Sequence, residues 1–169
     1  PQGSPTTRGK AIVNLLSLDP GEKVSAFLPV REFAEGRFVL FATARGIVKK
    51  TGLAEYSRPR PSGIIAINLD SEDELIAVRV TDGEQQVALS TRNGMLVRFA
   101  ESEVRPMGRA AGGVKGVNLD ADDRVVALDV VRPEAMRLTV SANGYGKRSL
   151  VDESRLVHRG ATAVLTMNR

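Results

Sequence analysis

The chain has 169 residues, no cysteine and a formal net charge of +4, with an isoelectric point near 9.8. This length suits one sizeable domain, and the lack of cysteine excludes a disulfide framework and a thiolate metal site. No apolar run approaches the roughly 20 residues that cross a bilayer, so we expect no membrane partner and a cytoplasmic location. Residues 1–7 are polar, and we expect a linker or tail rather than a signal peptide.

A unit of about 50 residues recurs along the chain. Each copy opens with a glycine, an apolar run and then Asn-Leu, and residues 159–164 begin the pattern a fourth time. The opening glycines are Gly9, Gly63, Gly113 and Gly160, which lie 54, 50 and 47 residues apart. A period in this range indicates a propeller blade or a solenoid unit. We therefore expect one domain over residues 8–169, with units at about 8–61, 62–111 and 112–158 and a partial unit at 159–169.

The sequence pattern of each unit predicts short antiparallel strands on both sides of a turn glycine. This glycine is Gly46 in the first unit, Gly94 in the second and Gly144 in the third. Two of these turns read Asn-Gly, which favours a tight hairpin because both central residues need positive φ. The second strand of a unit is expected at 75–78 and 125–128, and the third at 38–42, 87–90 and 137–140. The fourth strand is expected at 47–51, 95–99 and 145–150. No amphipathic helix of three turns is visible, so the sequence predicts an all-β fold with four-stranded antiparallel blades. Aromatic residues are scarce, so the core should be Val, Leu, Ile and Ala.

Basic residues follow the repeat. Lys50, Arg98 and Arg148 each lie four residues after a hairpin glycine, and Lys49 and Lys147 precede two of them. More bases lie in the stretches that join the units: Arg58, Arg60, Arg105, Arg109, Lys115, Arg155 and Arg159. Because equivalent positions of repeated blades point outward at equivalent angles, we expect a basic band around one rim. Such a band suits the backbone of a polyanion such as double-stranded DNA, bound without sequence preference. A solvated basic face without a partner is the alternative.

Several motifs then resemble the C-terminal domain of DNA gyrase A, over nearly the whole chain. The most specific is Arg-Phe-Ala-Glu-Ser-Glu-Val-Arg-Pro-Met-Gly-Arg at 98–109, and the others are residues 8–16, 20–24, 46–51, 63–69, 81–85, 113–114 and 143–148. The resemblance implies a β-pinwheel, a propeller-like fold with strands exchanged between blades, which binds and wraps DNA on a positive outer rim. It also implies a non-catalytic part of an ATP-dependent type II topoisomerase that introduces negative supercoils. The implied partners are double-stranded DNA, the rest of gyrase A and gyrase B, at the bacterial nucleoid.

The chain departs from that family in two ways. The Gln-Arg-Arg-Gly-Gly-Lys-Gly box that wrapping requires is absent, and the chain holds about three units and an extra strand where the family usually has six. DNA binding and bending therefore carry over, while wrapping by this chain alone does not. We expect the extra strand, residues 161–167, to complete the third blade by exchange. A fragment of a longer protein and a redesigned repeat protein both fit the sequence, as does the related topoisomerase IV domain, although residues 103–109 favour gyrase.

The predicted phosphate contacts are all basic: Lys49, Lys50, Arg98, Arg109, Lys115, Lys147 and Arg148. Catalysis is not expected, because His158 is the only histidine and no Ser/His/Asp set, metal cluster or P-loop occurs. Tyr56 and Tyr145 do not follow an arginine, as the strand-cleaving tyrosine of type II topoisomerases does. We expect no cofactor, no metal and no small-molecule substrate, and we interpret the acidic residues at 70–74 as turn and rim residues. A protein-interaction propeller is the alternative function, and it would require an exposed apolar patch.

Overall fold

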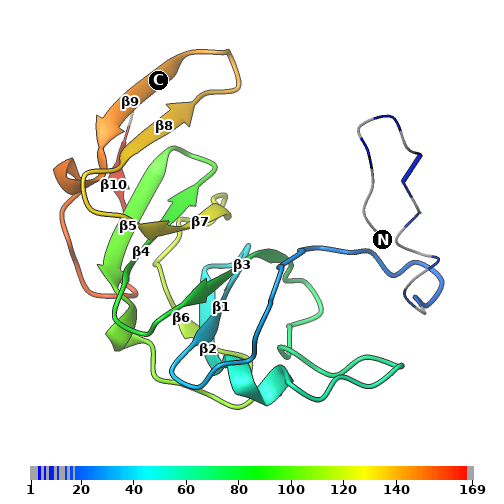
Figure 1. The fold of residues 1–169 in the computed structure, drawn as a ribbon. Helices are drawn as coiled ribbons and strands as arrows, with labels where there is room; N and C mark the ends of the chain where they lie inside the picture. Colours follow the sequence, from blue (N-terminus) through cyan, green and yellow to red (C-terminus); the bar gives the residue numbers. More distant parts are fainter. Residues whose placement is uncertain are drawn as a thin grey trace.

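The computed structural model describes residues 4, 6, 8, 9, 11, 14, 16 and 18–166. Within that part of the chain the secondary structure consists of ten strands and three short 3-10 helices, so the expected all-β fold is confirmed (Figure 1). In chain order the elements are β1 (Phe38–Thr43), β2 (Ile47–Gly52), η2 (Leu53–Tyr56), β3 (Leu75–Thr81), β4 (Gln86–Thr91), β5 (Met95–Ala100), η3 (Glu101–Glu103), β6 (Val114–Lys115), β7 (Val125–Val131), β8 (Met136–Val140), β9 (Gly146–Leu150), η4 (Val151–Glu153) and β10 (Val164–Leu165). The expected tail at 1–7 and the first strand at 9–15 fall largely outside the described residues.

Each blade is built around one hairpin and takes its outer strands from later units. The first sheet has the order β3-β1-β2-β6 and the second has the order β10-β5-β4-β7, while β8 and β9 form a two-stranded sheet. The hairpin of one unit therefore pairs with the second strand of the next unit and with the first strand of the unit after that. Contacts between β3 and β7 then join the two complete blades.

The extra strand completes a different blade from the expected one. Val164 of β10 lies opposite Leu96 of β5, as Val114 of β6 lies opposite Val48 of β2. The strand therefore completes the second blade. β10 begins 50 residues after β6, whereas the opening glycines Gly113 and Gly160 are 47 residues apart. The expectation of a completed third blade was wrong, because the repeat pattern does not state which hairpin an outer strand joins.

The core is aliphatic, as expected, and lies between the first two blades. Leu40 and Val48 of the first blade pack with Leu89 and Phe99 of the second in a cluster whose other fully buried members are nearly all Val, Leu or Ala. Burying one such side chain contributes about 1.5–3 kcal/mol, so the contact between blades is a main source of stability. A smaller cluster around Val39, Phe41 and Leu53 lies on the far side of the first blade.

The turn glycine of the first hairpin is required by a close contact as well as by backbone conformation. Gly46 joins β1 to β2 with a φ of 81°, and a Cβ there would lie 2.8 Å from the Val117 side chain. The first hairpin turn therefore fits against the segment that follows β6, whereas the positive φ is common to Gly46, Gly94 and Gly144.

Candidate nucleic-acid interface

Lys49 lies on β2 and is fully buried. Its Nζ donates hydrogen bonds to the carbonyl oxygens of Ala66 at 2.6 Å and Arg109 at 2.5 Å, and it lies 5.3 Å from the centroid of the Phe41 ring. Burial lowers the pKa of Lys49 to about 8, although the charge of Glu55 opposes this shift. Lys49 therefore holds two linking stretches, around residues 66 and 109, against the first blade.

Lys50 points to the next unit instead of to solvent. Its Nζ donates a hydrogen bond to the Glu101 carbonyl at 3.1 Å, lies 3.9 Å from the Glu101 carboxylate, and lies 5.1 Å from the centroid of the Phe38 ring. Burial lowers the pKa of Lys50, and the negative charge of Glu101 partly offsets that effect. Glu101 is itself fully buried and accepts a hydrogen bond from the Thr81 hydroxyl.

Arg98 makes the same contact one unit later. Its Nη1 donates to the Val151 carbonyl at 2.7 Å and to Asp152 Oδ1 at 2.9 Å, so the base of β5 binds the 3-10 turn η4 as Lys50 of β2 binds η3. We call this contact the inter-unit latch. The prediction that Lys49, Lys50 and Arg98 contact phosphate needs correction, because these side chains are buried and engaged by carbonyl oxygens.

The other four predicted contacts reach the surface. Lys115 on β6 and Lys147 and Arg148 on β9 are exposed, while Arg109, in the stretch after η3, is half-buried. The expected band at equivalent positions is therefore not formed, since two of its three register positions turn inward. Further exposed bases lie in the linking stretches that follow the 3-10 turns, at Arg58, Arg60, Arg105 and Arg155.

Arg109 lies beside two further arginines, which we did not select from the sequence. An open hollow is lined by Arg58, Arg60 and Arg109 together with Ser57 and Glu55. Both Arg58 and Arg60 are exposed, and Lys49 fixes the backbone of Arg109 from beneath. Their place in a linking stretch, outside the repeated register, was the signal that could have identified them.

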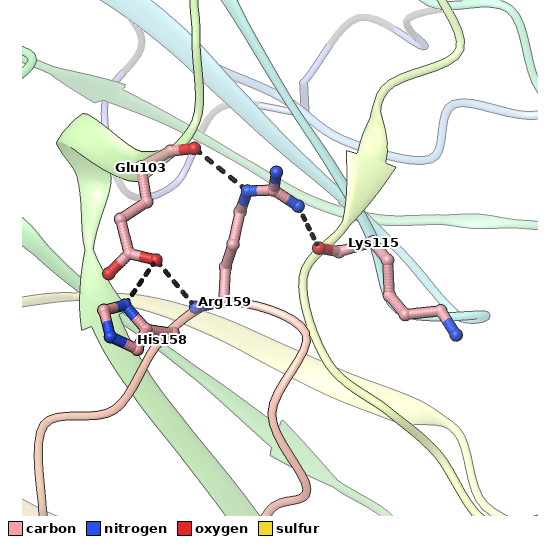
Figure 2. Close-up of polar contacts among 4 residues, drawn as sticks. All are labelled: Glu103, Lys115, His158 and Arg159. Carbon is pink, nitrogen blue, oxygen red and sulfur yellow. Dashed lines mark hydrogen bonds and ion pairs between the residues drawn. The ribbon is translucent and has the colours of Figure 1, made fainter.

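The last linking stretch is tied to the preceding one (Figure 2). Arg159 donates from its Nε to the Glu103 carbonyl at 2.9 Å and from its Nη1 to the Lys115 carbonyl at 3.1 Å, and its backbone N–H donates to the Glu103 carboxylate. The ring of His158 lies 3.3 Å from the same carboxylate. Figure 2 shows the Lys115 side chain extending away from Arg159, so its ammonium group is not part of this tie.

The acidic residues of the linkers serve in turns, as expected. Asp73 accepts hydrogen bonds from the backbone N–H groups of Arg45 and Glu74, and Glu72 pairs with the Arg45 side chain at 2.6 Å. Among the described residues no group of three His, Cys, Asp or Glu side chains could hold a metal ion. No described helix has the length and apolar character needed to span a membrane.

The chain matches the model of a known family over most of its length. The family model described as "DNA gyrase C-terminal domain, beta-propeller" matches residues 1–31, 37–82, 85–132 and 138–168. The chain belongs to this gyrase C-terminal domain family. The DNA gyrase A protein of Salmonella typhimurium is 50% identical over 167 residues, and that of Clostridium acetobutylicum is 54% identical over 166 residues. These matches cover 99% and 98% of the chain but only 19% and 20% of the relatives.

Two solved structures share the fold of this chain. The C-terminal domain of DNA topoisomerase IV has a TM-score of 0.86 and 32% identity, over 93% of this chain and 49% of that structure. A DNA gyrase A C-terminal domain has a TM-score of 0.84 and 25% identity, over 94% of this chain and 53% of that structure. The chain thus spans about half of each solved domain and about a fifth of the gyrase A proteins it matches.

Proposed function

We propose that this domain binds duplex DNA through its phosphates, without sequence preference, and bends it. The hollow lined by Arg58, Arg60 and Arg109 carries this proposal, because three arginines line one open hollow. The chain also belongs to the gyrase C-terminal domain family, and its relatives include gyrase A proteins. Guanidinium groups match phosphate oxygens in pairs of hydrogen bonds. Each phosphate contact also releases counterions, which gives affinity that does not depend on sequence.

The proposed contact set differs from the predicted one. Arg109, Lys115, Lys147 and Arg148 keep the predicted role, and Arg58 and Arg60 join them because they are exposed beside Arg109. Lys49 supports the set from inside by holding the Arg109 backbone. Contacts distributed along several units can offset the energy needed to bend the duplex.

In the cell the domain would act as a non-catalytic part of DNA gyrase, with the remainder of gyrase A and with gyrase B, at the bacterial nucleoid. Its role there would be to support ATP-dependent negative supercoiling. The curated relatives named above are all gyrase A proteins, which favours gyrase over topoisomerase IV, although a topoisomerase IV domain is among the similar structures.

The test is binding to a linear duplex of about 40 base pairs at several salt concentrations, with fluorescent labels at the two ends. We expect salt-sensitive binding and shortening of the end-to-end distance. In the double variant Lys115→Ala with Lys147→Ala, the slope of log affinity against log salt should become less steep by about two, since each lost phosphate contact removes about one. Arg45→Ala is the matched control, because it removes an exposed base that pairs with Glu72.

Equal slopes for the double variant and the control would remove Lys115 and Lys147 from the interface. No binding by the wild-type chain at low salt would reject the DNA proposal. A protein-interaction scaffold would then come first, since β8 and β9 expose an apolar face of the kind that such a function requires.

A further inference from the structure

The linking stretch 57–63, which follows η2, differs in sequence from the two later ones. It reads Ser-Arg-Pro-Arg-Pro-Ser-Gly, and all of its residues are exposed. It corresponds to 105–111 and 155–161, because each stretch ends in a turn whose last residue donates its N–H to the carbonyl three residues earlier: Gly63 to Arg60, Ala111 to Gly108 and Ala161 to His158. The later stretches contain neither two prolines nor an arginine at the positions of Arg58 and Arg60.

Pro59 removes a backbone hydrogen bond that both later stretches make. At the equivalent position, Met107 and Val157 donate their N–H groups to the carbonyls of the two latch bases, Lys50 and Arg98. Proline has no N–H group, so the first linking stretch cannot make this bond with any neighbouring strand. The difference is therefore a property of the residue at 59.

Pro61 removes a side-chain contact as well. It stands at the position of Arg159, whose guanidinium group donates to the Glu103 and Lys115 carbonyls (Figure 2). Proline offers no donor for such a contact, and each proline fixes its own φ near about −65°. A proline also favours an extended backbone at the residue before it, which here is an arginine in both cases. The stretch is therefore a narrow, extended segment.

The two arginines of this stretch have unpaired guanidinium groups. Arg58 and Arg60 line the open hollow together with Arg109, and neither makes a hydrogen bond or ion pair with a described residue. An extended backbone of the polyproline type rises about 3.1 Å per residue, so the Cα atoms of Arg58 and Arg60 are about 6 Å apart. In Figure 1 the chain that leaves η2 runs outward, away from the strands of both complete blades, before it returns to β3.

We propose that Arg58 and Arg60 enter the minor groove of the bound duplex and select positions that are rich in A·T pairs. This inference rests on the proposed function, and it adds to that function a preference for where along the duplex the linking stretch lies. The other bases of the proposed contact set bind phosphates and contribute no such preference.

The minor groove of a bent duplex suits this stretch in width and in charge. The groove is about 6 Å wide, so it admits a single extended segment but no helix or hairpin. Where a duplex bends around a protein, the minor grooves that face inward attract arginine, and a narrow groove has the most negative potential. Arginine is also more weakly hydrated than lysine, so it loses less hydration on entering the groove.

The preference for A·T pairs follows from the atoms on the floor of the groove. A·T pairs present only acceptors there, whereas a G·C pair adds the amino group of guanine, which is a donor. The guanidinium groups of Arg58 and Arg60 are donors only, so they bond the acceptors and are opposed by the amino group. Runs of A·T pairs also have the narrower groove.

The test compares three duplexes of about 40 base pairs that differ only in a central segment of about six pairs, which are A·T, G·C or inosine·cytosine. Inosine lacks the minor-groove amino group of guanine but keeps the major-groove atoms. We expect the full chain to bind the A·T and inosine duplexes at least about fivefold more tightly than the G·C duplex, which is the lower range for one specific base-pair contact.

The variant Arg58→Lys with Arg60→Lys keeps both charges and should bind all three duplexes about equally, with an unchanged dependence on salt. Arg105→Lys with Arg155→Lys is the matched control, because it changes two exposed arginines of the later linking stretches. This control should keep the preference of the wild type for A·T and inosine pairs.

Equal, salt-sensitive binding of all three duplexes by the wild type would overturn the inference and leave the DNA proposal intact. Discrimination against the inosine duplex would place the contact outside the minor groove and would also overturn the inference. A preference that persists in the double lysine variant would come from duplex deformability instead of these arginines, with the same consequence. Absence of binding to every duplex would reject the proposed function and this inference with it.

Discussion

Replacing Lys49 with methionine tests how a buried base stabilises the linking stretches around residues 66 and 109. The methionine keeps most of the apolar stem but removes the Nζ that bonds the Ala66 and Arg109 carbonyls. Ala66 retains a hydrogen bond from the Tyr56 hydroxyl at 3.1 Å, so Arg109 is the carbonyl that loses its side-chain donor. Leaving such a group unsatisfied costs about 1–3 kcal/mol.

The pKa of Lys49 makes this loss depend on pH. The folded value is about 8 and the unfolded value is 10.5, so the unfolded state binds more protons between these two values. Wild-type stability should therefore rise with pH in this window, by about 3 kcal/mol at most. The neutral amine still has two N–H groups, which is enough for both carbonyls.

The methionine variant lacks this dependence. Near pH 7 the wild type buries a charged ammonium group at a cost in free energy, and the methionine variant avoids this cost. Because this gain offsets the lost hydrogen bonds, the variant should be equal to the wild type in stability or about 1 kcal/mol less stable. At pH 10.5 the deficit should be larger by about 2–3 kcal/mol. Lys50 also has a lowered pKa, but it is present in both proteins and its effect cancels in the difference.

The assay is urea unfolding at pH 7, 9 and 10.5, followed by circular dichroism because the chain has no tryptophan. Lys147→Met is the control, since it removes one exposed ammonium group that holds no buried carbonyl. A difference between wild type and the Lys49 variant that stays constant, or that shrinks as the pH rises, would refute the reasoning.

Two further predictions concern the contacts between units. Gly113→Ala should destabilise the fold more than Gly63→Ala, although both glycines have positive φ, because a Cβ at Gly113 would lie 2.7 Å from the Val48 carbonyl oxygen and one at Gly63 would meet nothing within 4 Å. Both should lose about 1–2 kcal/mol from backbone strain, with an added loss at Gly113, and equal thermal unfolding would contradict this. Lys50→Met should cost about 3–5 kcal/mol in chemical unfolding because it leaves the buried Glu101 carboxylate without its cation, and the double change with Glu101→Gln should recover part of that loss.

The sequence predicts the hairpins well because their signals are local. Turn glycines at Gly46, Gly94 and Gly144 and the alternating apolar residues on each side define β1–β2, β4–β5 and β8–β9 to within one or two residues. The outer strands were harder, because their partners lie one or two units away along the chain. Residues 64–69 carry the pattern of a first strand but form none, since a strand needs a neighbour as well as a pattern.

Three of the predicted phosphate contacts, Lys49, Lys50 and Arg98, are buried for a related reason. A position that recurs in every unit can lie on the outer rim or between neighbouring blades, because both environments repeat once per unit. Repetition of Lys50 and Arg98 therefore signalled a structural latch equally well, and burial decides for the latch. Arg58 and Arg60 lie outside the repeated register, and their side chains are exposed. Arg148 stands at the same register position as Lys50 and Arg98, yet its side chain is exposed, so the repeated position alone does not decide between latch and surface.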